Sequence, residues 1–361
     1  MGEGVRLYAG TQHGIFVWRS SNGGWAEVSR EAEDRAFDSI VGSRVRPEVV
    51  FTVAGKQGGV LRTTDGGKSW QRVLEGEFRA VAIDPTDDRV VYAGAEPVQL
   101  FRSEDGGDSW EELKSLPAMP ESVREKWWTP YPPATGHVRN VFIHPADPNI
   151  LYLCLEHGGV VRSFDRGATW EDVSGGIDYV DMHVLANLPG TKDRYYVSSA
   201  RGFFTAQDAA GGWEWAQNGM PFNYFHDFLF VPGKNSGDPP SILLAAADGS
   251  PGFWRRESRP ARAGVLRSDN CAESWYQVGD NLPKELDAFM WALTPHPHDP
   301  NAVFGGIGAV NRGEAVDTPH NGSIALMDSP GEILLTRDRG DTWERLDLRL
   351  PADRVLWAAA D

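Results

Sequence analysis

The stretch that decides the fold is Thr63-Thr64-Asp65-Gly66-Gly67-Lys68-Ser69-Trp70, because its pattern of Ser or Thr, Asp, Gly and Trp recurs along the chain. Near-complete copies are found at 103–110 (SEDGGDSW), 163–170 (SFDRGATW) and 336–343 (TRDRGDTW). A worn copy at 268–275 (SDNCAESW) has lost the Asp and the Gly, and degenerate copies lie at 20–25 and 205–213. Internal repetition of this kind predicts a repeat architecture in which every copy marks one supersecondary unit.

The spacing within the motif has a physical reason. An Asp carboxylate can accept hydrogen bonds from the backbone amides of a tight turn, while Gly adopts the positive φ that the turn requires. The Ser or Thr hydroxyl can lock the turn from its other side, and the Trp can anchor the following strand by burying a large ring. The motif is therefore predicted to stabilise hairpin turns, and a metal-binding or catalytic Asp is the alternative interpretation.

The pattern S/T-x-D-x-G-x-S/T-W resembles the Asp-box, or BNR repeat, of sialidases, sortilin-type receptors, xyloglucan-degrading hydrolases and the photosystem II assembly-factor family. The resemblance covers essentially the whole chain and implies a β-propeller in which the boxes are structural and lie away from the active site. A true sialidase would carry an early Arg-Ile-Pro motif and an arginine cluster. Val5-Arg6-Leu7-Tyr8 stands in the first blade instead, so sialidase activity is not expected.

Each copy lies within a larger unit of four strand-like segments. One strand ends at a Pro, a second follows, a third enters the motif and a fourth leaves it, which is the make-up of a propeller blade. The sequence thus predicts an all-β fold, a single seven-bladed β-propeller domain over 1–361. The predicted blades are 353–361 with 5–28, 36–73, 78–113, 137–173, 179–216, 224–278 and 287–346. Pairing of the C-terminal strand with the N-terminal blade would close the ring and remove exposed sheet edges.

Composition limits the function classes and the compartment. Among 361 residues, 35 are basic and 51 acidic, and the net charge of −16 argues against nucleic acid and anionic membranes as partners. No run of about 18 apolar residues predicts a transmembrane helix, and the N-terminal residues lack the regions of a signal peptide. The two cysteines, Cys154 and Cys271, belong to no metal-ligand pair. A cytoplasmic protein with unpaired thiols is expected.

Long insertions gather on one predicted face. If the motif turns mark the bottom of the disc, loops from second to third strands and between blades emerge at the top. The extra segments 114–136, 248–264 and 309–331 all fall in top-side connections. Insertions on one face of a repeat protein usually build its binding surface, so the top face is predicted to carry the function.

Histidines are concentrated at the same face. His137, His183 and His226 begin innermost strands in consecutive blades, and His157 lies in a turn between second and third strands. Neutral imidazole suits a divalent ion such as Zn, Mn, Fe or Cu, so these four residues are candidate metal ligands. Acid–base or substrate-binding roles and purely structural roles stay open for the same side chains.

Carboxylates accompany these histidines. Glycoside hydrolysis uses two carboxyl groups across the scissile bond, one of them with a raised pKa, and Glu156 and Asp181 on adjacent blades are the candidate pair. His183 completes the candidate catalytic set, whereas solvated rim charges are the alternative. Candidate substrate-binding residues are arginines that would orient an anionic group and aromatic residues that would stack on a sugar ring: Arg139, Arg201, Trp127, Trp128, Tyr131 and Trp291. Trp127 and Trp128 could instead attach their insertion to the propeller.

Two function classes follow from this arrangement. The first is an enzyme at the top channel mouth, a hydrolase or lyase acting on a saccharide-like or other polar small molecule, with a bound metal assisting. The second is a non-catalytic binding propeller that binds a protein partner at the same top face, similar in role to the assembly factors. The sequence leaves the substrate, the identity of any metal and the oligomeric state open.

Overall fold

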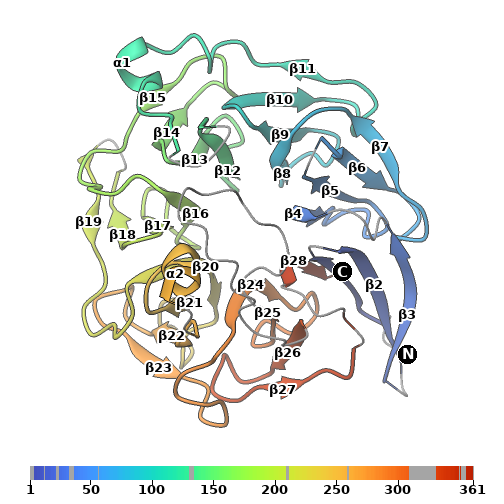
Figure 1. Cartoon of the computed structure of the whole chain (residues 1–361), viewed down its shortest axis with the longest axis vertical. Helices are drawn as coiled ribbons and strands as arrows, with labels where there is room; N and C mark the ends of the chain where they lie inside the picture. The colour runs from blue at the N-terminus through green and yellow to red at the C-terminus, as the bar shows by residue number, and fades with distance from the viewer. Residues whose placement is uncertain are drawn as a thin grey trace.

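The chain forms a ring of seven antiparallel four-stranded sheets, seen along its axis in Figure 1. The computed structural model describes residues 4–11, 13–21, 24–31, 36–55, 57–129, 134–208, 211–257, 260–308, 331–348, 350 and 355–360. Within these ranges every sheet is one blade, and neighbouring innermost strands contact each other around the ring. The predicted all-β, seven-bladed propeller is confirmed.

Six blades use four strands that follow one another in sequence, whereas the first takes its innermost strand from the C-terminal end. From the innermost strand outward, the first three blades are β28 (Val355–Ala360), β1 (Arg6–Thr11), β2 (Gly14–Ser21), β3 (Gly24–Glu31); β4 (Phe37–Gly42), β5 (Val50–Ala54), β6 (Gly59–Thr63), β7 (Gln71–Leu74); and β8 (Phe78–Ile83), β9 (Val91–Ala95), β10 (Gln99–Ser103), β11 (Glu111–Glu112).

The remaining four blades keep the same order. They are β12 (His137–Ile143), β13 (Leu151–Glu156), β14 (Gly159–Ser163), β15 (Glu171–Asp172); β16 (Met182–Asn187), β17 (Tyr195–Ser199), β18 (Phe203–Ala206), β19 (Glu214–Trp215); β20 (Tyr224–Val231), β21 (Ser241–Ala247), β22 (Ala263–Ser268), β23 (Tyr276–Val278); and β24 (Phe289–Pro295), β25 (Val303–Gly308), β26 (Glu332–Thr336), β27 (Glu344–Arg345).

The ring is closed by strands from the two ends of the chain. β28 pairs antiparallel with β1, with Leu7 opposite Ala360 and Gly10 opposite Trp357. β28 also contacts the innermost strands on either side, β24 and β4. The expected closure by the C-terminal strand is therefore confirmed, and it leaves no innermost edge of the first blade unpaired.

The repeated motif forms a hydrogen-bonded turn, as its residue types predict. In the first copy Asp65 Oδ1 accepts from the backbone amides of Lys68 and Ser69 at 3.0 Å, and Oδ2 accepts from the Ser69 hydroxyl at 2.6 Å. The Thr63 hydroxyl accepts from the Gly67 amide at 3.0 Å. The Ser69 hydroxyl and these amides hold the pKa of Asp65 at about 2. Both oxygens of the Asp65 carboxylate therefore accept hydrogen bonds from within the turn, in agreement with a structural role.

The hydrophobic core lies between neighbouring blades. One cluster joins Tyr92 and Leu100 of the third blade to Val138 and Leu153 of the fourth, and similar clusters occupy the other junctions. Each sheet is covered on both faces, which explains why the second strands are almost continuously apolar. Cys154 is buried in one of these junctions as a free thiol, and burial raises its pKa.

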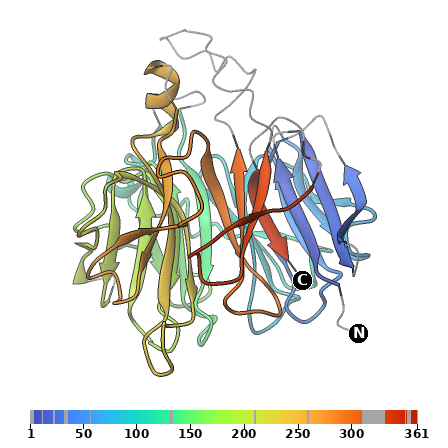
Figure 2. The same cartoon turned by 90° about the horizontal axis from the view of Figure 1, so that it is seen from below.

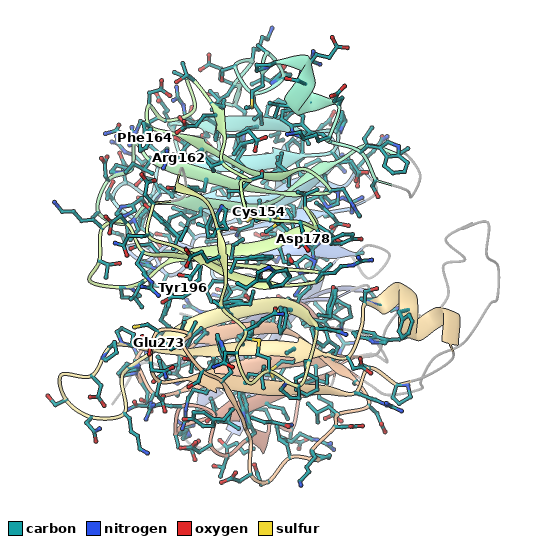
Figure 3. The ribbon with its side chains drawn as sticks, turned by 90° about the vertical axis from the view of Figure 1, so that its left-hand side faces the viewer. Cys154, Arg162, Phe164, Asp178, Tyr196 and Glu273 are labelled. Carbon is teal, nitrogen blue, oxygen red and sulfur yellow. The ribbon has the colours of Figure 1, made fainter. Side chains whose placement is uncertain are left out.

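The two described helices belong to insertions. α1 (Glu121–Arg124) lies in the segment after β11, and α2 (Pro251–Glu257) stands above one face of the disc in Figure 2. Phe164 and Glu273, both from motif copies, lie at the face opposite α2 (Figure 3). The insertion at 309–331 falls outside the described residues except for its last position. Neither helix has the length and apolarity needed to span a bilayer.

Candidate functional site

All seven innermost strands carry a β-bulge near the end where the strand begins, in β28 between Val355 and Trp357, and in the other six the inserted side chains are described. Register shifts relative to the second strand occur in β4, β8, β12, β16, β20 and β24. A bulge inserts one extra residue and re-aims a side chain, and bulges are common beside active sites. We call the inserted residues the bulge ring: Asp38, Arg79, Arg139, His183, His226 and Trp291.

Members of the bulge ring meet one another across blade boundaries. Asp38 Oδ2 lies 2.6 Å from Arg79 Nη1, and Arg139 Nη2 lies 2.8 Å from His226 Nε2, two blades away. The His183 and His226 ring centres are 5.0 Å apart, and those of His226 and Trp291 are 5.3 Å apart. The bulges therefore turn side chains from separate blades toward a shared region at one end of the propeller axis.

Glu156 lies beside this ring at the end of β13. Its Oε2 is 3.0 Å from His137 Nε2 and 3.9 Å from Arg139 Nε. Burial opposes ionisation of the carboxyl, but His137 and Arg139 outweigh it and hold the pKa of Glu156 well below its ordinary value. Glu156 is thus a carboxylate at neutral pH.

Asp181, just before β16, faces two imidazoles. Its Oδ2 lies 3.7 Å from His157 Nε2 and its Oδ1 lies 3.7 Å from His183 Nε2. Oδ1 is buried and has no hydrogen-bond partner among the described residues. Burial and the charge of Glu156 raise the pKa of Asp181 well above its ordinary value. The pKa values of these two carboxyl groups, on adjacent blades, are therefore shifted in opposite directions. Such a pair can supply one proton donor and one charged carboxylate to the same reaction.

The two histidines of the bulge ring are held as neutral tautomers. His183 Nδ1 donates to the Phe225 carbonyl at 2.6 Å, and His226 Nδ1 donates to the Trp291 carbonyl at 3.0 Å, because a carbonyl oxygen only accepts. Burial and the nearby Arg139 charge lower the pKa of His183 to about 4. Nε2 of His183 therefore carries no proton and faces Asp181 as a hydrogen-bond acceptor.

The four histidines predicted as metal ligands do not form one donor set. His226 has Nδ1 bonded to a carbonyl and Nε2 in contact with Arg139, so it would have to give up Arg139 to bind an ion. His137 directs Nε2 at Glu156. The described residues whose donor atoms lie together, within 4.8 Å of one another, are Glu156, His157 and Asp181. Sequence reasoning grouped the histidines by type and missed that two of them already have partners.

The predicted substrate-binding residues fall into different environments. The Arg201 guanidinium carbon lies 4.2 Å from the ring centre of Tyr179, whose ring lies 6.1 Å from that of His157. Trp291 is only 2% exposed and its indole N–H donates to the Gly308 carbonyl, so it supports His226 from within the core and offers no free stacking face. Tyr131 lies outside the described residues.

The neighbouring tryptophans of the long insertion behave differently. Trp127 is half-buried against the core cluster between the third and fourth blades, which fits the alternative that it attaches the insertion. Trp128 is 56% exposed.

Two residue sets at this end of the propeller were missed from sequence. Tyr179 links Arg201 to His157. A separate ion-pair cluster between the second and third blades joins Arg79 to Asp38, Glu77 and Glu96. The sequence did contain a signal for Arg79. Alignment of 78–85 (FRAVAIDP) with 137–145 (HVRNVFIHP) places Arg79 at the position of Arg139. Glu96 and Glu156 likewise occupy equivalent places at the end of the second strand of their blades.

Fold and site define a seven-bladed β-propeller with a cluster of ionisable side chains at one end of its axis. No protein-family model matches the chain. Among curated proteins it is similar to a xyloglucanase of a Paenibacillus species, 23% identical over 380 residues that cover 84% of this chain and 36% of the relative. A probable oligoxyloglucan-reducing end-specific xyloglucanase of Neosartorya fischeri is 23% identical over 294 residues, 73% of this chain and 33% of the relative. The chain spans about a third of the length of these relatives.

Solved structures agree on the fold. A GH74 enzyme of Niastella koreensis superposes with a TM-score of 0.60 at 15% identity, covering 86% of this chain and 45% of the other. The GH74 xyloglucanase of Xanthomonas campestris gives 0.59 at 14% identity, covering 97% and 67%. YCF48 from Cyanidioschyzon merolae gives 0.52 at 16% identity, covering 86% and 84%. At these identities the likeness extends to the propeller fold.

Proposed function

We propose that the chain is a saccharide-hydrolysing enzyme whose site is the Glu156–Asp181 cluster at the top channel mouth. The observation that carries the proposal is the pair of carboxyl groups from adjacent blades, close together and with opposite pKa shifts. The xyloglucanases among the similar proteins support a glycosidic substrate. At 23% sequence identity these relatives do not specify which saccharide is the substrate, and experiment has to identify it.

The roles follow from protonation state. Asp181, whose pKa is raised, is assigned as the proton donor to the leaving-group oxygen, while Glu156, whose pKa is lowered, is the charged partner. One oxygen of each carboxyl group lies within 4.8 Å of the other. That is nearer to the roughly 5–5.5 Å spacing of a retaining pair than to the roughly 6.5–9.5 Å that leaves room for a water. Glu156 is therefore assigned to stabilise or attack the positively charged sugar carbon directly. His183 orients Asp181 through its fixed tautomer, and His137 together with Arg139 keeps Glu156 ionised.

The decisive experiment compares conservative substitutions of equivalent carboxylates. Purified protein is assayed for new reducing ends on xyloglucan, xyloglucan oligosaccharides and cello-oligosaccharides. Glu156→Gln and Asp181→Asn are expected to lower kcat by about 10²–10⁴-fold, since each removes one acid–base partner. Glu96→Gln is the matched control, because Glu96 has the same position one blade earlier but is paired with Arg79 at 2.7 Å. Equal losses in all three variants would contradict the assignment.

The same samples decide between this chemistry and the alternatives. Stoichiometric zinc or manganese that is lost in His157→Ala and retained in His226→Ala would assign the cluster to metal-assisted hydrolysis. Absence of hydrolysis on every saccharide, together with specific retention of one protein partner that Glu156→Gln abolishes, would favour the binding propeller. The YCF48 likeness makes that second outcome worth measuring; one YCF48 structure is described as bound to a peptide.

A further inference from the structure

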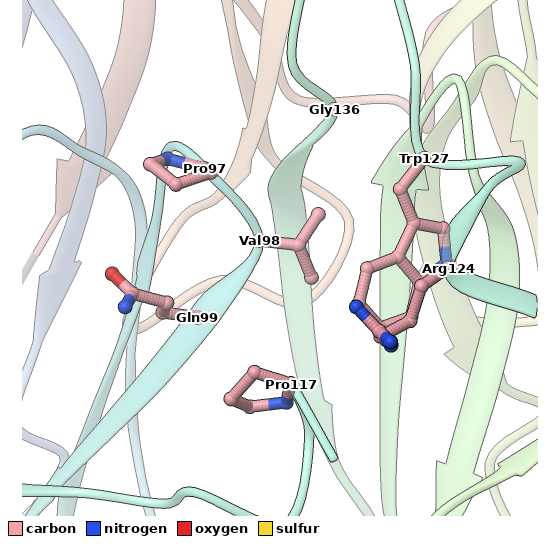
Figure 4. Close-up of a pocket in the computed structure, with 7 residues that line it drawn as sticks. All are labelled: Pro97, Val98, Gln99, Pro117, Arg124, Trp127 and Gly136. Carbon is pink, nitrogen blue, oxygen red and sulfur yellow. The ribbon is translucent and has the colours of Figure 1, made fainter. Parts of the chain in front are cut away.

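A pocket opens beside the candidate site, between the third blade and the long insertion (Figure 4). Its volume is about 250 Å³. The turn from β9 to β10 supplies Pro97 and Val98, and β10 supplies Gln99. The insertion supplies Pro117, Arg124 and Trp127. The pocket therefore exists only because the insertion folds back over the blade.

The pocket combines an aromatic wall with hydrogen-bonding groups. In Figure 4 the indole nitrogen of Trp127 is on the side away from Val98 and Gln99, so its six-membered ring faces the pocket. The Gln99 amide donates to Glu112 at 3.3 Å, which leaves its carbonyl oxygen as an acceptor. Arg124 is exposed and uses Nε on the Met119 carbonyl at 2.8 Å, which leaves its terminal N–H groups as donors. An apolar face with a few placed polar groups is the make-up of a small-molecule site.

Pocket and candidate site share a wall. Gly136 lines the pocket, and the next residue is His137, which contacts Glu156. A Cβ on Gly136 would lie 3.2 Å from the Glu156 carbonyl oxygen, and a Cβ on Gly158 would lie 3.0 Å from Trp127 Cδ1. The indole thus packs directly against the turn that carries His157. A ligand held in the pocket would therefore lie beside the turn that carries Glu156 and His157.

We propose that this pocket is an accessory subsite that holds one sugar ring of a saccharide chain whose neighbouring part lies at Glu156 and Asp181. The proposal rests on the proposed function for its substrate class. The C–H face of a pyranose would stack on Trp127, and its hydroxyls would bond to Gln99 and Arg124. A volume below the approximately 300–1,000 Å³ of drug-sized sites matches a single ring.

Binding is measured by calorimetry on the Glu156→Gln background, with a xyloglucan heptasaccharide and cellotetraose as probes. Trp127→Ala is expected to raise the Kd by about tenfold or more, because it removes the stacking wall. Trp128→Ala is the matched control: it removes the adjacent exposed indole, which does not line the pocket, and should leave the Kd within about twofold. Gln99→Trp fills the pocket while keeping Trp127 in place, so it tests the subsite even if Trp127→Ala disturbs the insertion.

The outcomes separate the subsite from the hydrolytic activity. On the wild-type background, Gln99→Trp should raise KM for the oligosaccharides by more than it raises KM for a single-sugar aryl glycoside, which is too short to reach both the pocket and Glu156. Hydrolysis by wild type with a Kd that neither Trp127→Ala nor Gln99→Trp alters would overturn the subsite and retain the proposed function. Binding that depends on both residues without any hydrolysis would retain the subsite and overturn the proposed function. No binding of either probe to any variant would overturn the subsite.

Discussion

At the residue scale, equivalent positions acquire different chemistry from their neighbours. Glu96 and Glu156 lie at the ends of the second strands of adjacent blades. Arg79 binds Glu96 at 2.7 Å, whereas Arg139 is 3.9 Å from Glu156 and contacts His226. The difference arises because the bulge residues beyond Arg139 are histidines. The third-blade carboxylate is neutralised in an ion-pair cluster, while Glu156 stays beside Asp181.

Asp227, next to His226, gives a prediction for the pH dependence of stability. Burial outweighs the hydrogen bond from the Leu293 amide at 2.8 Å and raises the pKa of Asp227 to about 7. Because the folded-state pKa lies above the ordinary 3.8, the group favours folding fully below about pH 4 and loses this contribution as the pH rises through 7. Asn keeps the acceptor for Leu293 and does not titrate.

We therefore expect the free energy of unfolding of wild type to fall relative to Asp227→Asn between pH 4 and 7, by up to about 4 kcal/mol, and to level off above. Urea unfolding of both proteins at several pH values measures this difference. Parallel stability curves would show that Asp227 has an ordinary pKa in the folded protein.

At the element scale, the motif turns fix where each outer strand begins. Gly107 has a φ of 92° in the second copy, and a Cβ there would lie 2.8 Å from Phe51 Cε1 in the preceding blade. The turn therefore needs glycine both for its backbone conformation and for the close contact between blades.

Gly107→Ala is expected to lower the free energy of unfolding by about 1–3 kcal/mol, from backbone strain and displacement of Phe51. Gly175→Ala is the matched control, because a Cβ on Gly175 meets no heavy atom within 4 Å. Denaturant titrations compare the two variants with wild type. A Gly107→Ala protein as stable as the control would mean that the turn relaxes without cost.

At the scale of the whole molecule, stability depends on closing the ring. β28 supplies the innermost strand of the first blade from the far end of the chain and touches the innermost strands on both sides. Its removal would expose the edge of β1 and break the ring between β24 and β4. An exposed edge strand is also a template for association with other chains.

Deletion of 351–361 is expected to lower the Tm by more than about 5 °C, which for a chain of this length corresponds to losing roughly 4 kcal/mol or more, and to promote aggregation. A synthetic peptide of residues 354–361 added in trans should restore part of the lost Tm, whereas a scrambled peptide should not. Scanning calorimetry with light scattering measures both effects. An unchanged Tm after deletion would show that β28 is dispensable for closure.

The sequence determined the architecture because its signals are local. The residues of Thr63 to Trp70 specify a turn through hydrogen bonds a few positions apart, and repetition of that turn with alternating strands is sufficient to predict seven blades and the closing strand. Glu156, Asp181 and His183 could be nominated from the same pattern, because blade symmetry brings strand ends toward the axis.

Only the tertiary structure decided which of these side chains are already held by other residues or buried, and which face the candidate site. His226 is occupied by Arg139 from two blades away, Trp291 is buried beneath it, and Trp127 forms a pocket with Gln99 of the preceding blade. Such contacts join residues far apart in sequence, and they depend on bulges and side-chain rotamers that no local pattern encodes. The sequence therefore determines the seven-bladed propeller, whereas contacts between blades determine how the side chains of the candidate site are arranged.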